Sequence, residues 1–147
     1  MIHFDETTAF RLFRRLGVGQ GSFAMYLLIC PTEDWLIVED DLKAEADVQL
    51  GLKLPFNDIE ILLREPSLAG DCLDQPVCAF RISELNSAVI SMVDTHVVRL
   101  ERSGGQLLFL STQNTAEQLL VKTPNFRNRL TEVLRITPDP SFGELTA

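Results

Sequence analysis

Short, almost continuously apolar runs alternate along this chain with stretches in which apolar residues recur every three or four positions. The apolar runs are residues 23–30, 77–82 and 106–111, and such runs are typical of strands covered on both faces. The stretches between them have the spacing of amphipathic helices. This alternation predicts an α/β fold, a three-layer sandwich around a mostly parallel central sheet.

The same patterns set the expected bounds of the other elements. Two further strand candidates, which bring the sheet to about five strands, are residues 47–54 and 132–136. Helices are expected over residues 5–16, 32–46, 56–65, 83–102 and 116–122, with a short helix or turn at 125–131. Their expected N-terminal caps are Asp5, Thr32, Ser83 and Thr115. The expected core includes Phe23, Met25, Leu27, Ile29, Phe80, Ile82, Leu108 and Leu110.

The length of 147 residues fits one domain with an ordinary core. We expect residues 1–137 to form it, because Pro138 and Pro140 mark residues 138–147 as a tail or linker. The first residues lack the basic and apolar segments of a secretory signal, and no apolar run approaches the roughly 20 residues that span a bilayer. The expected location is therefore the cytoplasm, with no membrane contact.

The cysteines and histidines do not have the spacing of a metal site. Cys30 and Cys78 lie in apolar runs and are expected to be buried, whereas Cys72 lies in a loop, where a Cys72–Cys78 disulfide is the less favoured alternative. His96 falls on the apolar stripe of a helix. We therefore expect a reduced protein without a metal.

Charge argues against nucleic acid as a partner. Thirteen basic and 21 acidic residues give a net charge of −8, which repels phosphate at long range. The run Glu39-Asp40-Asp41 is expected to be a solvated helix face. Two basic clusters interrupt this trend, and we expect them to pair with nearby carboxylates; the alternative is that they bind an acidic protein surface or a local phosphate. Their residues are Arg11, Arg14, Arg15, Arg127 and Arg129.

The positions at which a phosphate-binding loop is expected lack its residues. The glycine-rich segment 17–21 follows a helix and precedes a strand, the reverse of the order that directs backbone N–H groups at an anion. Residues 31–35, after the first central strand, contain neither glycine nor lysine. The strand 77–82 ends near Arg81 and Ser83, where a magnesium site requires an aspartate. We therefore expect no nucleotide cofactor.

Polar residues at the carboxyl ends of the strands form a second possibility, a small-molecule site in the crevice at that edge of the sheet. These residues are also ordinary cap and turn formers, so both interpretations stay open. The candidates are Thr32, Glu33, Ser83, Ser111, Thr112 and Asn114.

Several segments together resemble a P-loop-like N-terminal domain of large bacterial multidomain regulators, the signal-transduction ATPases with numerous domains and their repeat-containing relatives. The segments are residues 10–15, 21–30, 105–111, 116–120 and 123–129, and the resemblance covers about residues 10–136. Both Walker signatures are missing, and Asn125 replaces the acid that usually follows the proline at position 124.

The resemblance implies a degenerate, non-hydrolysing member of this group. Its role would be to recruit or relay to protein partners or adjoining domains in signalling or defence. The alternative is a domain that binds a small molecule or nucleotide at the strand ends. Self-association is left open.

Overall fold

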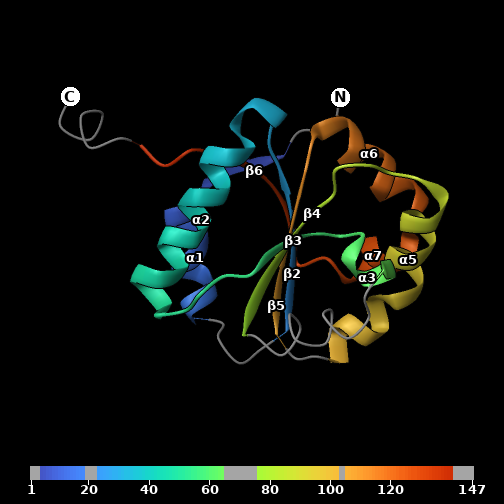
Figure 1. Ribbon diagram of the computed structural model, residues 1–147, viewed down its shortest axis with the longest axis horizontal. Coiled ribbons are helices and arrows are strands. Elements are labelled where there is room, and N and C mark those ends of the chain that lie inside the picture. Colours follow the sequence, from blue (N-terminus) through green and yellow to red (C-terminus); the bar gives the residue numbers. More distant parts are fainter. Residues whose placement is uncertain (1–3, 19–22, 65–75, 103–104, 141–147) are drawn as a thin grey trace.

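The computed structural model describes residues 4–18, 23–64, 76–102 and 105–140. Within them, six strands form one all-parallel sheet with helices on both faces (Figure 1). The strand order is β1-β6-β2-β5-β4-β3. The predicted α/β sandwich is confirmed, and the sheet has one strand more than expected.

The strands are β1 (Asp5–Thr8), β2 (Ala24–Ile29), β3 (Phe56–Asp58), β4 (Val77–Arg81), β5 (Gln106–Ser111) and β6 (Glu132–Thr137). The helices are α1 (Ala9–Val18), α2 (Trp35–Leu50), α3 (Ile61–Arg64), α5 (Ser87–Arg102), α6 (Gln113–Lys122) and α7 (Pro124–Arg129), with a 3-10 turn, η1, at Thr32–Asp34. No helix in the described part of the chain is both long and apolar enough to cross a membrane.

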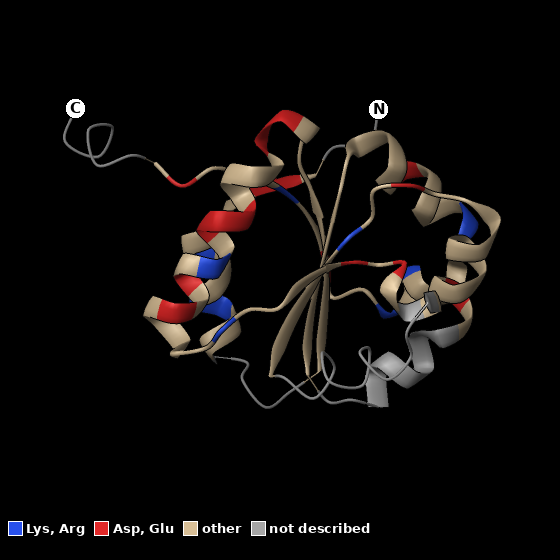
Figure 2. Ribbon diagram, in the orientation of Figure 1, with Lys and Arg blue, Asp and Glu red and all other residues tan. Residues whose placement is uncertain are grey.

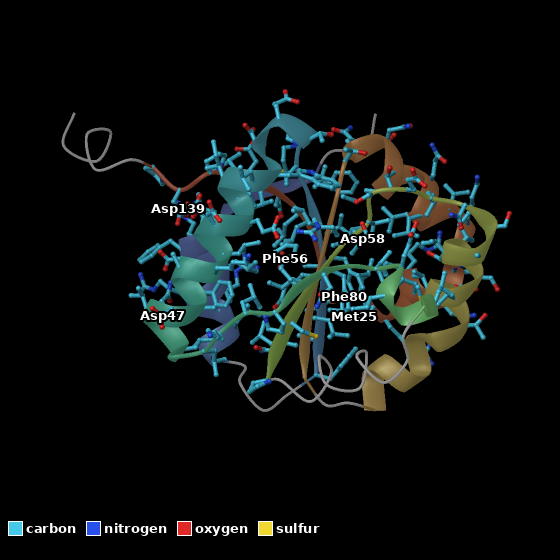
Figure 3. The ribbon with its side chains drawn as sticks, in the orientation of Figure 1. Met25, Asp47, Phe56, Asp58, Phe80 and Asp139 are labelled. Atoms are coloured by element: carbon cyan, nitrogen blue, oxygen red, sulfur yellow. The ribbon has the colours of Figure 1, made fainter. Side chains whose placement is uncertain are left out.

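The two faces of the sheet carry separate apolar cores. Tyr26 and Leu28 of β2 belong to the core under α1 and α2, whereas Met25, labelled in Figure 3, belongs with Leu27 and Ile29 to the core under α5, α6 and α7. Every residue of β2 and β5 is buried, as the apolar runs predicted. All the predicted core residues are buried except Phe23, which is half-buried at the start of β2 and packs against the core.

The predicted helix over residues 5–16 starts four residues late. Asp5–Thr8 forms β1, which pairs with β6 in parallel register from Asp5 opposite Leu134 to Thr8 opposite Thr137. The cap prediction for Asp5 is therefore wrong. The spacing of apolar residues within this segment favours a helix. The strand could not be foreseen, because its partner β6 lies more than a hundred residues further along the chain.

The predicted strand over residues 47–54 is also wrong. Helix α2 continues to Leu50 and ends at Gly51, whose φ of 64° is the left-handed conformation that glycine adopts readily. The N–H groups of Gly51 and Leu52 donate to the carbonyls of Asp47 and Ala46. The strand of this region, β3, instead occupies the start of the predicted helix 56–65, of which only α3 is helical.

Three of the predicted helix caps lie elsewhere. Thr32 sits in the 3-10 turn and caps nothing with its side chain. Asn86, not Ser83, accepts the N–H of Val89 at the start of α5. Helix α6 begins earlier than predicted because Thr112 accepts the N–H of Thr115. Asn86 and Thr112 cap as well as the predicted residues would, whereas Asp34, at the N-cap of α2, makes no side-chain cap bond.

The chain stays on the domain after β6. The Asp139 N–H donates to Asp41 Oδ2 at 2.8 Å, and the Asp139 carboxylate accepts the N–H of Phe10 at 3.1 Å. The division into residues 1–137 and 138–147 stays a prediction. The predictions for His3, Gly19, Gly21 and Cys72 fall outside the described residues, as does the side chain of His96.

Candidate functional site

The carboxyl ends of the parallel strands meet at one edge of the sheet, where α/β domains bind their ligands. Because β2 lies between β6 and β5, the segment that follows β2 stands beside the segment that follows β5. The structure therefore brings Thr32 and Glu33 to the same edge as Ser111, Thr112 and Asn114. Ser83 lies further along this edge, after β4.

The connection from β2 to α2 is a short, internally bonded turn. Cys30 N–H donates to the Ser111 carbonyl at 2.9 Å, and Asp34 N–H donates to the Pro31 carbonyl at 3.0 Å. The indole N–H of Trp35 donates to the Cys30 carbonyl at 2.8 Å. The turn leaves Thr32 exposed and directs two carboxylates, of Glu33 and Asp34, to the start of α2.

The Cys30 side chain, at the root of this turn, is fully buried. Burial raises the pKa of its thiol to about 12, with smaller contributions from the carboxylates of Asp34 and Glu33. The thiol therefore stays protonated at neutral pH. Cys78 is buried as predicted. Within the described residues, no three His, Cys, Asp or Glu side chains gather to hold a metal ion.

A half-buried ion pair, with its carboxylate buried and its arginine side chain 31% exposed, occupies the end of β4. Arg81 donates to the carboxylate of Glu39 on α2, a side chain only 9% exposed, and its guanidinium lies 5.6 Å from the Phe56 ring centre. Lys43 is 3.9 Å from the same carboxylate. The predicted solvated face at Glu39-Asp40-Asp41 is therefore wrong for Glu39. Sequence could not reveal the pair, because its partners lie 42 residues apart.

Ser83 is engaged in the connection beyond β4. Its hydroxyl donates to Asp58 Oδ2 at 2.7 Å, and Asp58 Oδ1 accepts the N–H of Glu60 at 3.2 Å. The N–H of Ile59 donates to the Arg81 carbonyl at 2.8 Å. These bonds tie the ends of β3 and β4 together. Ser83 therefore acts here as a structural group, separate from the residues after β2 and β5.

The residues after β5 differ in their availability. Ser111 is fully buried, and its hydroxyl has no hydrogen-bond partner among the residues that the structure describes. Thr112 uses its side-chain oxygen to cap α6, and Asn114 is exposed. Arg135, at the end of β6, donates to the Gln113 side chain at 3.0 Å. Only Asn114 of this group offers its side chain to solvent without an evident structural task.

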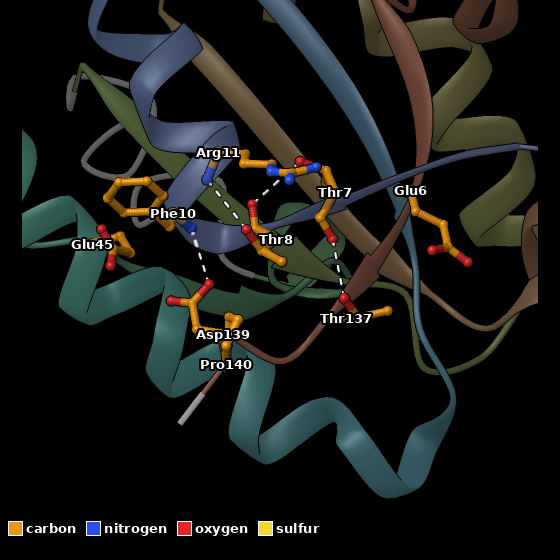
Figure 4. A pocket seen from close by; sticks show the side chains of 9 residues that line it. All are labelled: Glu6, Thr7, Thr8, Phe10, Arg11, Glu45, Thr137, Asp139 and Pro140. Carbon is orange, nitrogen blue, oxygen red and sulfur yellow. Dashed lines mark hydrogen bonds between the residues drawn. The ribbon is translucent and has the colours of Figure 1, made fainter. Parts of the chain in front are cut away.

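A cleft of about 620 Å³ opens at the far end of the same edge, over β1 and β6 (Figure 4). Its walls come from the ends of both strands, the start of α1, the middle of α2 and the segment after β6. They comprise Glu6, Thr7, Thr8, Phe10, Arg11, Glu45, Thr137, Asp139 and Pro140. Sequence analysis missed this cleft because β1 was assigned to a helix.

The chain's own Asp139 closes one side of this cleft. Its carboxylate receives the Phe10 N–H at the start of α1, and the Thr8 hydroxyl accepts the N–H of Arg11 (Figure 4). Burial raises the pKa of Asp139, the bond from Phe10 lowers it, and the charges of Asp41 and Glu45 raise it further. The net direction is upward, so the ionised carboxylate is disfavoured in the folded state.

Asp139→Asn is expected to stabilise the protein at pH 7 by up to about 1 kcal/mol. A carboxyl whose pKa is raised by folding contributes its full stability below its unfolded pKa of about 3.9, and loses it as pH rises through the higher folded value. The gain should therefore vanish near pH 3.5. Thermal unfolding of the wild-type chain and the variant from pH 3.5 to 8 measures this gain in stability. Asp5→Asn, at an exposed position of β1, is the control. A variant less stable at pH 7 contradicts the expectation.

The two basic clusters lie on opposite faces of the sheet. On α1, Arg15 pairs with Glu132, Arg14 lies 5.7 Å from the Phe10 ring centre, and Arg11 is exposed beside the cleft. Arg127 is exposed and Arg129 half-buried on α7, across the sheet. The two clusters therefore do not form one surface. The expected pairing with a carboxylate is seen for Arg15, which pairs with Glu132.

The comparisons with known proteins show a fold and no family. No family model matches this chain, and no curated protein matches it. Among solved structures, the DnaC helicase loader is similar with a TM-score of 0.54 at 10% identity, over 92% of this chain and 94% of that one. DnaI is similar with a TM-score of 0.56 at 14% identity, over 89% and 81%. These likenesses identify the fold as that of P-loop-like α/β domains.

Proposed function

We propose that this chain is a degenerate P-loop-like domain that neither binds nor hydrolyses nucleotide at the usual position. It acts as a non-enzymatic regulatory module that contacts protein partners or adjoining domains. The observation that carries the proposal is the closed turn between β2 and α2, with its bonds from Asp34 to Pro31 and from Trp35 to Cys30. In the P-loop fold this turn is the place where phosphates are held.

The chemistry of the turn opposes a triphosphate. A phosphate cradle needs backbone N–H groups aimed at the anion, glycines that let the backbone approach, and a lysine. Here Pro31 has no N–H, the Asp34 N–H is already bonded within the turn, and the Glu33 and Asp34 side chains are acidic. Their charges suit the start of a helix and repel an incoming phosphate.

The end of β4 supports the same conclusion. In P-loop NTPases, an aspartate at the corresponding strand end holds the magnesium ion. This chain has Arg81 there, a cation bound to the buried Glu39 carboxylate. The arginine repels a divalent ion, and Glu39 is committed to the pair, so neither group is available for metal-assisted phosphoryl transfer.

A role with protein partners is supported by the surface and by analogy. Arg11, Arg14 and Arg127 are exposed cations on an otherwise acidic chain, suited to an acidic protein surface. One of the similar structures is a helicase loader, a protein named for its action on another protein. We propose that this chain likewise serves a partner, in a bacterial cytoplasmic signalling or defence system, without contacting nucleic acid or membrane.

One observation favours the second candidate, a small-molecule site at the strand ends. Among the described residues, the buried Ser111 hydroxyl lacks a partner, and it lies beside exposed Asn114 and the exposed Thr32 and Glu33 of the neighbouring turn. A ligand that satisfied this hydroxyl would draw Thr112 into its site, and Ser83 would join only if its bond to Asp58 opened.

Thermal unfolding with ATP, ADP and GTP, each with and without Mg²⁺, separates the two candidates. The non-enzymatic proposal predicts no stabilisation at millimolar nucleotide. A ligand at one hundred times its dissociation constant adds about 2.7 kcal/mol, which is readily detected. A nucleotide that stabilises the wild-type chain overturns the proposal in favour of the second candidate if Thr32→Ala or Ser111→Ala abolishes the effect. Thr95→Ala, at an exposed position of α5, is the control and should preserve it.

A further inference from the structure

Helix α2 exposes apolar side chains on the face turned away from the sheet. Ile37 is 52% exposed and Val48 is 79% exposed, whereas Val38, Leu42 and Ala46 of the same helix are buried in the core. An ordinary surface helix is apolar on one face only. The outer face of α2 therefore carries apolar surface that the fold of one chain does not use.

The exposed apolar residues of α2 follow one stripe. Ile37, Ala44 and Val48 are separated by seven and four residues, which places them on one side of a helix. All three are exposed, and Leu36, at 72% exposure, directly precedes Ile37 and lies about 100° around the helix from it. The stripe runs for most of the helix length rather than forming a single exposed side chain.

The surroundings of the stripe carry opposite charges on two neighbouring helices. Asp40 and Asp47 are exposed next to it on α2, while Arg11 and Arg14 are exposed on α1. The two helices pack side by side on one face of the sheet, with the Gln49 side chain donating to the Phe10 carbonyl at 3.0 Å. Figure 2 shows both red and blue residues in this layer, and α2 itself also carries the exposed Lys43.

We propose that this outer α1–α2 face is the surface through which two copies of the chain associate. A two-fold axis along the apolar stripe of α2 places the two stripes against each other, and it places α1 of each protomer over the acidic side of its partner's α2. The basic side chains of Arg11 and Arg14 then meet an acidic row, and the apolar stripes meet near the axis. The face is thus complementary to itself, which is the requirement of a two-fold interface.

This inference is independent of the proposed function, because a nucleotide-binding domain could dimerise through the same face. It commits to a second copy since the surface supplies both signs of charge and the apolar strip between them. A partner that was only acidic would leave the carboxylates of α2 facing like charges, which costs affinity. A partner that was only basic would do the same to the arginines of α1.

Sedimentation velocity over 5–200 µM protein tests the inference. The wild-type chain is expected to reach a dimer within this range, and Val48→Glu is expected to raise the dissociation constant at least tenfold, with an unchanged circular dichroism spectrum. Val121→Glu is the matched control, since Val121 is equally exposed, at 76%, on α6 across the sheet. A wild-type chain that stays monomeric at 200 µM, or a control variant that dissociates equally, overturns the inference.

A charge exchange supplies the second arm. Arg14→Glu alone is expected to weaken the dimer several-fold, because it places a carboxylate against the acidic row of the partner. Arg14→Glu combined with Asp47→Arg restores opposite signs, and should recover most of the association. Weakening without recovery means that Arg14 and Asp47 do not meet, and overturns the proposed arrangement.

Discussion

Phe109→Ala is expected to lower the free energy of unfolding by about 4 kcal/mol. Phe109 is fully buried in the middle of β5. Its ring stacks on Phe80 of β4 at 5.7 Å between centres, and it meets the Phe126 ring of α7 edge-on at 5.2 Å. The substitution therefore removes apolar burial and two aromatic contacts, and leaves a cavity where sheet and helix layers meet.

Urea unfolding measures this loss as a lower midpoint with an unchanged slope. Phe10→Ala is the matched control, since Phe10 is a phenylalanine that is 47% exposed on α1, and its loss should stay below about 1 kcal/mol. If both substitutions cost the same small amount, the core under α5, α6 and α7 is not packed as described.

Arg81→Met is expected to cost about 3 kcal/mol of unfolding free energy. Removal of the guanidinium leaves the buried Glu39 carboxylate of α2 with one other cation of the described residues nearby, Lys43 at 3.9 Å. Arg81→Met combined with Glu39→Leu removes both charges together, and should recover most of the loss. The pair thus fixes the local arrangement at the end of β4 more than it adds to total stability.

A double-mutant cycle in urea measures this coupling. Arg127→Met serves as the control, because Arg127 is an exposed arginine on α7 whose loss should cost under about 1 kcal/mol. A single Arg81→Met variant as stable as wild type would show that Glu39 is not desolvated, and that the end of β4 is open to solvent and to metal.

The central strands were predictable from sequence because their signal is local. Residues 23–30, 77–82 and 106–111 are apolar on both faces, and a strand inside a parallel sheet requires that composition. The short strands β1 and β3 carry no such signal. They exist because β6 and β4 offer backbone partners, and the sequence does not state which distant segments will pair.

The site was predictable in its outline and not in its contacts. The sequence shows that glycine and lysine are absent after β2. It also shows Arg81 at the end of β4, where a magnesium site requires an aspartate. The Glu39–Arg81 pair and the cleft closed by Asp139 could not, because each unites groups from distant parts of the chain. Charge runs such as residues 39–41 are usually solvated, and only the rotation of α2 turns Glu39 inward.

The indole N–H resonance of Trp35 tests the central claim most directly. Trp35 is the single tryptophan of the chain, and its indole N–H is bonded to the Cys30 carbonyl at the position where a P-loop would hold phosphate. The account predicts that this resonance, and the amide resonances of residues 32–35, stay unchanged as Mg-ATP is added to 10 mM. A saturable shift of the indole resonance together with these amides would contradict it.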